Sequence, residues 1–213
     1  KFVDRTFNLK IENIRRILDF FKTNWRDGLY LHFEIFPDRL SGEMLEEIRR
    51  FPDGGLHLEA GVQSFYQPSL KAVSRRQDEQ KTLDNLRFIR EQTGAEIHAD
   101  LVAGLPYSTY DTFSRDFDKL MAVRPQELQL GILKRLRGAP IDRHSQVCAM
   151  VYSKYPPYEI MQNKDMSYAE LQRIKRIARY LDCCWGRRLL VLRRWMILAV
   201  LSGKIISRRI KFP

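Results

Sequence analysis

Hydrophobic and polar residues alternate in several short segments of the chain, and longer stretches with helical spacing separate these segments. The clearest segment is 98–108, HADLVAGLPYS, in which an apolar run with one carboxylate leads into a Gly-Leu-Pro turn. Alternation with a period of two places His98, Asp100 and Val102 on one face of the predicted strand. Strands are predicted at 2–7, 29–36, 56–62, 96–103 and 128–133.

Between these strands, apolar residues recur every three or four positions, which is typical of amphipathic helices. Ser41 is expected to cap the second helix, and Ser108 or Thr109 the fifth. Gly94 is expected to end the fourth helix. Helices are predicted at 11–21, 42–51, 68–73, 78–92, 110–123 and 167–181.

Alternating strands and helices predict an α/β fold with a parallel sheet, either doubly wound or barrel-like. We favour a partial parallel (β/α) TIM-like barrel over residues 1–141, because strand ends that bear acidic residues resemble the top of such a barrel. Residues 142–182 are predicted to form a linker and a helical appendage, and residues 183–213 form a basic, apolar tail.

The sequence His-x-acid occurs in three of the predicted strands, and in each case the acid is nearer the C-terminal end. The pairs are His32 with Glu34, His57 with Glu59, and His98 with Asp100. Parallel strands of a barrel bring such ends together where functional sites are built. A buried strand that ends in an ordinary turn is the alternative for each segment taken alone.

Composition narrows the choice of function. The chain has 213 residues, 44% of them hydrophobic, so it can bury a sizeable core. The net charge is +11, but residues 183–213 supply eight positive charges and no acid, which leaves only +3 for the rest. Nucleic-acid binding is therefore disfavoured, although a non-catalytic module that binds through the basic tail stays an alternative.

Three cysteines, Cys148, Cys183 and Cys184, have neither the number nor the spacing of a disulfide framework or a CxxC metal site. A reducing, cytoplasmic location fits this pattern. The first residues, KFVDRTFN, resemble neither a signal peptide nor a natural start, and we expect a fragment of a longer protein. The longest apolar run, 195–201, is too short to span a membrane.

Five segments carry a resemblance to a known family. In order along the chain they are HFEIFPD, EAGVQS, VSRRQ, HADLVAGLP and LQLGILKRLRGAP. Together they resemble the core of radical S-adenosylmethionine (SAM) enzymes, closest to the class that often includes a cobalamin-binding domain. Coproporphyrinogen dehydrogenases and anaerobic Mg-protoporphyrin monomethyl ester cyclases share this core. The resemblance covers about residues 1–140, which would be strands 2 to 6 of the family barrel.

The resemblance implies roles for particular residues. Glu34 would contact the methionyl ammonium of SAM, as a carboxylate facing a cation does. Gln63, with the adjacent Ser64, would hydrogen-bond the ribose or nearby atoms. Arg75 would bind the SAM carboxylate, although Arg76 is an alternative in the neighbouring register. The alternative for each of these residues is an ordinary surface or turn residue.

Further roles follow from the resemblance in the second half of the core. Asp100 would accept hydrogen bonds from the ribose hydroxyls. Gly104 would allow close approach of the backbone, and Pro106 would fix the exit into the next helix. Leu133 and Lys134 lie where family members enclose adenine with backbone and apolar contacts. We assign no catalytic residue and no metal ligand to this chain.

The sequence departs from the family at the cluster motif. The CxxxCxxC that binds a [4Fe-4S] cluster is absent, so the cluster ligands are expected outside this chain, which alone should be inactive. The full-length protein would cleave SAM reductively to a 5′-deoxyadenosyl radical, for cyclase, oxidoreductase or methyltransferase chemistry. The expected partners are a small or tetrapyrrole-like substrate and an electron donor such as flavodoxin or ferredoxin, with cobalamin in a preceding domain.

A different class of enzyme remains open at this point. The three His-x-acid pairs could ligate one or two divalent metals, as in barrel hydrolases. Each histidine lies one layer deeper than its acid, however, so a shared set of ligands would need an awkward reach. A core histidine that bonds to a neighbouring carboxylate is the commoner arrangement.

Overall fold

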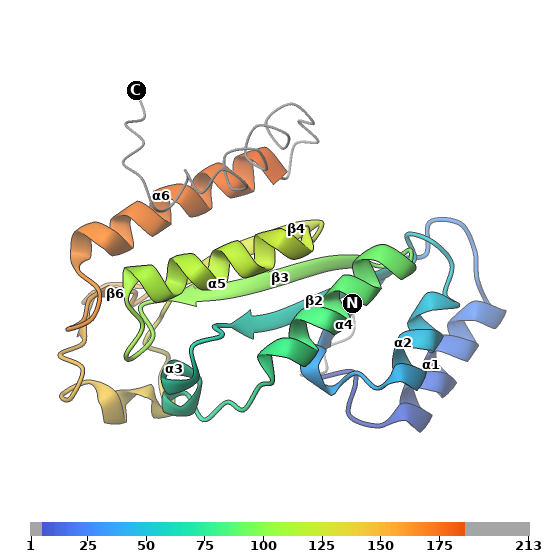
Figure 1. The fold of residues 1–213 in the computed structure, drawn as a ribbon, viewed down its shortest axis with the longest axis horizontal. Coiled ribbons are helices and arrows are strands. Elements are labelled where there is room, and N and C mark those ends of the chain that lie inside the picture. Colours follow the sequence, from blue (N-terminus) through green and yellow to red (C-terminus); the bar gives the residue numbers. More distant parts are fainter. Residues whose placement is uncertain (1–5, 186–213) are drawn as a thin grey trace. The chain divides into compact units, whose positions relative to one another are not determined.

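The structure is a computed structural model that describes residues 6–185, and for residues 182–185 only the helical backbone (Figure 1). The helices are α1 (Ile11–Thr23), α2 (Gly42–Arg49), α3 (Gln67–Ala72), α4 (Glu79–Gln92), α5 (Tyr110–Val123) and α6 (Tyr168–Trp185), with short 3-10 helices η1 (Pro37–Arg39) and η2 (Pro140–His144). The strands are β1 (Leu31–Ile35), β2 (Leu56–Gln63), β3 (Glu96–Ala103), β4 (Glu127–Ile132), β5 (Val151–Tyr152) and β6 (Ile160–Gln162).

Strands β1 to β4 form one parallel sheet in sequence order, and β5 pairs with β6 in a separate antiparallel hairpin. The chain divides into two compact units. The first contains residues 1–62, 77–100 and 122–127, and the second contains 63–76, 101–121 and 128–213. Strands β2, β3 and β4 each have residues in both units, and every contact described below lies within one of the units.

The core of the first unit lies on the apolar face of the strands. Phe33 of β1 and Leu58 of β2 are almost fully buried there, because alternate residues of each strand point to the same face. Helices α1, α2 and α4 contribute apolar residues at helical spacing, among them Leu18 and Leu86. The apolar side of the sheet is thereby covered, and the polar side chains of the same strands lie on the opposite face.

The second unit is built around α5 and α6. Phe117 of α5 and Leu171 of α6 are buried. The apolar residues whose spacing predicted the two helices are the residues that form their buried faces. Helix α6 contacts β6, and residues 155–158 belong to the turn that joins β5 to β6. None of the helices in residues 6–185 combines enough length with enough apolar character to span a lipid bilayer.

The predicted helix signals are confirmed with one correction. Ser41 accepts a hydrogen bond from the backbone of the first turn of α2, and Thr109 accepts one from the first turn of α5. Asp78, which was not predicted as a cap, accepts one from the first turn of α4. Gly94 does not end α4 through a left-handed conformation, because the C-cap is Thr93 and the φ of Gly94 is not positive. Glycine is required at 94 for space instead, since a Cβ there would lie 2.0 Å from Oδ1 of Asp53.

Two predictions fall at the ends of the chain. Most of the predicted strand at 2–7, and the basic tail from residue 186 on, lie outside the described residues. Phe7 is described and lies in a bend, where its backbone N–H donates to the Glu34 carbonyl over 2.8 Å. Cys148 is a buried free cysteine.

Candidate functional site

The strands of the first unit have a face with regularly spaced ionisable residues, which we call the polar sheet face. It consists of His32, Glu34, His57, Glu59, His98 and Asp100. The register aligns His32 with His57, and Glu34 with Glu59. A row of imidazoles therefore lies next to a row of carboxylates, and the carboxylates are nearer the C-terminal ends of the strands, as the sequence predicts.

The imidazole row is closely packed. The ring centroids of His32 and His57 are 4.6 Å apart, and those of His57 and His98 are 5.8 Å apart. Nε2 of His32 lies 2.7 Å from Oε2 of Glu59, a carboxylate on the neighbouring strand. This pair has the arrangement that was expected as the commoner alternative to metal binding, a histidine bonded to a carboxylate.

His57 is held by a hydrogen-bonded chain through Tyr30. The Tyr30 hydroxyl lies 2.6 Å from Nδ1 of His57 and donates to Oε2 of Glu96 over 2.8 Å. Burial, and next the hydrogen bond to Glu96, raise the pKa of Tyr30. The pKa of His57 is lowered, mainly because burial disfavours the charged imidazolium and next because of the nearby His32.

His57, His98 and Glu127 are the residues of the described chain that converge as metal ligands do. One ligand atom from each lies within 4.8 Å of the others, and Nδ1 of His98 lies 3.6 Å from Oε2 of Glu127. The sequence singled out both histidines but not Glu127, the first residue of β4. Its position before an alternating strand, level with polar residues of the neighbouring strands, was the available signal.

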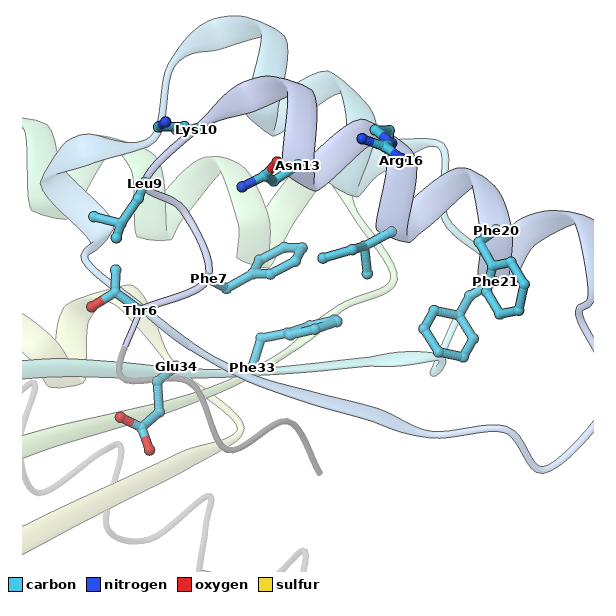
Figure 2. A pocket seen from close by; sticks show the side chains of 11 residues that line it. Thr6, Phe7, Leu9, Lys10, Asn13, Arg16, Phe20, Phe21, Phe33 and Glu34 are labelled. Atoms are coloured by element: carbon cyan, nitrogen blue, oxygen red, sulfur yellow. The ribbon is translucent and has the colours of Figure 1, made fainter.

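Glu34 lies at the edge of a cavity of about 550 Å³ between α1 and β1. Figure 2 shows Phe33 directed towards Phe7 and α1, whereas the carboxylate of Glu34 points to the other side of β1. The rings of Phe7 and Phe33 stack with centroids 3.8 Å apart. The side chain of Glu34 therefore belongs to the polar sheet face, and aromatic side chains define the cavity.

In the second unit, the predicted residues Gln63 and Ser64 lie at the end of β2. Gln63 has a φ of +67°, a backbone conformation that costs a non-glycine residue energy. The Ser64 hydroxyl donates to the buried Asp116 over 2.6 Å and accepts from the backbone N–H of Tyr66. Asp116 also accepts from the backbone N–H of Phe65 over 2.9 Å.

Asp116 was missed in the sequence. It lies on the buried side of α5 next to Phe117, and an acidic residue within an apolar stripe was the signal that could have identified it. Its two hydrogen bonds fix the backbone that follows Gln63, so it positions the strand end.

Arg75 follows α3, and its backbone N–H donates to the Leu70 carbonyl over 2.8 Å. The preceding residue, Ser74, has a φ of +58°. The guanidinium of Arg143 donates to the Ser74 hydroxyl and to the Ala72 carbonyl, over 2.7 and 2.8 Å. These contacts fix the backbone in front of Arg75.

The structure brings Gly104 and Leu133 together around Ile160. Leu133 donates to the Ala103 carbonyl and accepts from the backbone of Ile160. Gly104 has a φ of +85°, and a Cβ there would lie 2.5 Å from Cγ2 of Ile160. Its carbonyl accepts from the side-chain amide of Asn163. The close approach that requires glycine at 104 is thus made to the β5–β6 hairpin.

Of the seven predicted cofactor residues, Glu34 and Asp100 belong to the polar sheet face of the first unit. The other five belong to the second unit: Gln63, Ser64, Arg75, Gly104 and Leu133. Their contacts to a cofactor stay predictions.

Comparison with known proteins gives a local relative and a shared fold. Residues 148–189 match a family described as "Protein of unknown function (DUF4080)". Over 70 residues, 33% of the chain, the sequence is 36% identical to oxygen-independent coproporphyrinogen III oxidase of Pseudomonas aeruginosa. The matched part spans 15% of that protein.

Two solved structures have a similar fold. The radical SAM methyltransferase TsrM of Kitasatospora setae, with tryptophan and a SAM analogue bound, gives a TM-score of 0.57 at 17% identity, over 73% of this chain and 32% of TsrM. Elp3 of Methanocaldococcus infernus gives 0.51 at 18% identity, over 68% of this chain and 39% of Elp3. The predicted fold class, α/β with a partial parallel barrel as in radical SAM cores, is thereby confirmed.

Proposed function

We propose that the chain is the SAM-binding core of a radical SAM enzyme. The fold shared with TsrM supports this, and so does the local identity to coproporphyrinogen III oxidase, which favours membership of the radical SAM superfamily. The chain spans about a third of the length of TsrM, so the reaction of the whole protein is part of the proposal.

The observation that carries the proposal is the carboxylate row of the polar sheet face. Glu34 and Glu59 are aligned on neighbouring parallel strands, and Asp100 lies on the next strand of the same face. SAM presents an ammonium, a sulfonium and two ribose hydroxyls, and carboxylates suit the first two as cations and the hydroxyls as donors. In this proposal Glu34 binds the ammonium and Asp100 accepts from the ribose.

The roles that the resemblance implies for residues of the second unit are proposed for each residue by itself. Gln63, held in its unusual backbone conformation, hydrogen-bonds the ribose, and Arg75 pairs with the SAM carboxylate through its planar guanidinium. Leu133 contacts adenine. Ser64 acts mainly by fixing the strand end, because its hydroxyl already bonds to Asp116 and to Tyr66.

The cluster chemistry requires ligands that this sequence does not supply. Its cysteines, Cys148, Cys183 and Cys184, do not form a CxxxCxxC motif. A [4Fe-4S] cluster held by other cysteines would supply the electron that cleaves SAM. The TsrM structure with cobalamin and a [4Fe-4S] cluster bound supports cobalamin as a second cofactor. The substrate would be a small or tetrapyrrole-like molecule, with an external electron donor.

Nucleoside binding tests the proposal without the cluster. We expect the folded chain to bind SAM and 5′-methylthioadenosine, which share the ribose and adenine, in a calorimetric titration. Asp100→Asn removes the charge of the proposed ribose acceptor, which costs about 1.5–3 kcal/mol and weakens both ligands by roughly tenfold or more. Asp84→Asn, on the exposed side of α4, is the matched control and should bind as the unsubstituted chain does. Equal affinities for Asp100→Asn and Asp84→Asn would reject the proposed role of Asp100.

A further inference from the structure

We propose that His57, His98 and Glu127 bind one divalent first-row transition-metal ion. The three residues lie near the N-terminal ends of β2, β3 and β4, and both histidines belong to the row next to the proposed SAM carboxylates. One ligand atom of each lies within 4.8 Å of the others. This site is separate from SAM binding and does not depend on it.

The distances are close to those of a bound ion. Metal–ligand bonds of about 2.0–2.2 Å in a tetrahedral site place ligand atoms about 3.3–3.5 Å apart. Closing the present group to that spacing requires shifts on the order of 1 Å. The carboxylate of Glu127 can make such a shift because its side chain is 53% exposed, whereas those of His57 and His98 are largely buried on strands.

The hydrogen bonds of Tyr30 set the tautomer of His57. A tyrosine hydroxyl has one proton, and Tyr30 donates it to Glu96. The Tyr30 oxygen can then only accept a hydrogen bond from Nδ1 of His57. The proton of the neutral imidazole therefore lies on Nδ1, and the lone pair that can bind a metal lies on Nε2. Nε2 is therefore the atom with which His57 would bind a metal. A metal-ligating histidine typically has its other nitrogen hydrogen-bonded in this way.

The third histidine of the row does not belong to the group. Nε2 of His32 lies 2.7 Å from Oε2 of Glu59. His32 therefore makes the hydrogen bond or ion pair with a neighbouring carboxylate that is common for histidines in a protein core. Two imidazoles and one carboxylate suit zinc or ferrous iron, and they leave at least one position for water. An ion bound there would connect three neighbouring strands and so stabilise the fold.

The test uses the 213-residue chain without an affinity tag, after removal of metals with a chelator. We expect calorimetric titration with Zn²⁺ to give one ion per chain. Co²⁺ should give the visible absorption bands of a tetrahedral site, and Zn²⁺ should abolish them. Zinc should also raise the melting temperature, because it binds only the folded state.

Four variants locate the site. Glu127→Gln and His98→Gln each remove one ligand and should weaken Zn²⁺ binding by at least about tenfold, the loss usually seen even for groups that only orient a ligand. Tyr30 is a positioning residue, so Tyr30→Phe should weaken Zn²⁺ binding by about tenfold without changing the number of ions bound per chain. His144→Gln removes the one histidine outside the row and should bind as the unsubstituted chain does.

Circular dichroism establishes that each variant is folded. Absence of Zn²⁺ and Co²⁺ binding by the folded, unsubstituted chain would overturn the proposal. It would also be overturned if Glu127→Gln and His98→Gln bound zinc as tightly as His144→Gln. Either result would leave the SAM proposal unaffected, because that proposal is tested with a different ligand and different variants.

Discussion

Replacing Ser64 by alanine perturbs the hydrogen bonds that fix the end of β2 next to Gln63. Ser64 is 3% exposed, and its hydroxyl donates to Asp116 over 2.6 Å and accepts from the backbone of Tyr66 over 3.0 Å. The substitution removes a hydrogen bond to a charged group and leaves a backbone N–H without its acceptor. The first effect costs about 1.5–3 kcal/mol, so we expect Ser64→Ala to lower the free energy of unfolding by about 2–3 kcal/mol.

Ser69 provides a matched control in the same unit. It is fully buried, and its hydroxyl donates to the Pro106 carbonyl over 2.8 Å, a neutral acceptor. Ser69→Ala should therefore cost only about 1 kcal/mol, since hydrogen bonds to charged groups are roughly twice as strong as neutral ones.

Urea unfolding followed by circular dichroism measures both costs. A double-mutant cycle of Ser64→Ala with Asp116→Ala isolates the pairwise interaction, which we expect to be about 1.5–3 kcal/mol. A coupling energy below about 0.5 kcal/mol, or a smaller loss for Ser64→Ala than for Ser69→Ala, would refute the reasoning.

Two further predictions concern stability. Asp78→Ala removes the acceptor of the Lys81 N–H at the start of α4 and should cost about 1 kcal/mol in urea unfolding, whereas Asp78→Asn should cost much less because asparagine also caps. Gly104→Ala should cost about 1–3 kcal/mol, because φ is +85° and the new Cβ would lie 2.5 Å from Ile160. Gly28→Ala, with a φ of +83° but open space around it, should cost less in thermal unfolding, and an equal loss would show that the contact with Ile160 contributes nothing.

The secondary structure was largely predictable because its signals are local. Strand β3 has the predicted bounds, 96–103, since alternation and the following Gly-Leu-Pro turn both mark it. Ser41 and Thr109 cap their helices as predicted for the same reason: a side-chain oxygen reaches the N–H group three residues ahead. Gly94 shows where local prediction fails. A side chain at 94 is excluded by Asp53, which is distant in the sequence, and no local pattern reveals that contact.

The candidate site was predictable only in part. Alternation with a period of two was enough to place the histidines and acids of β1, β2 and β3 on one face. It could not show that His32 bonds to Glu59 rather than to Glu34, because that depends on the register of two strands. It also could not bring Glu127 to His98, since the two residues are far apart in the sequence.

Local patterns were enough to identify which residues form strands and helices and which face of each strand is ionisable, because backbone geometry fixes which neighbouring positions share a face. The order of five motifs along the chain was enough for the family resemblance. Tertiary packing was needed to show which carboxylate each imidazole contacts, why Gly104 must lack a side chain, and that Asp116 fixes the end of β2. Such contacts join distant segments, and their geometry is set by how strands align and helices pack.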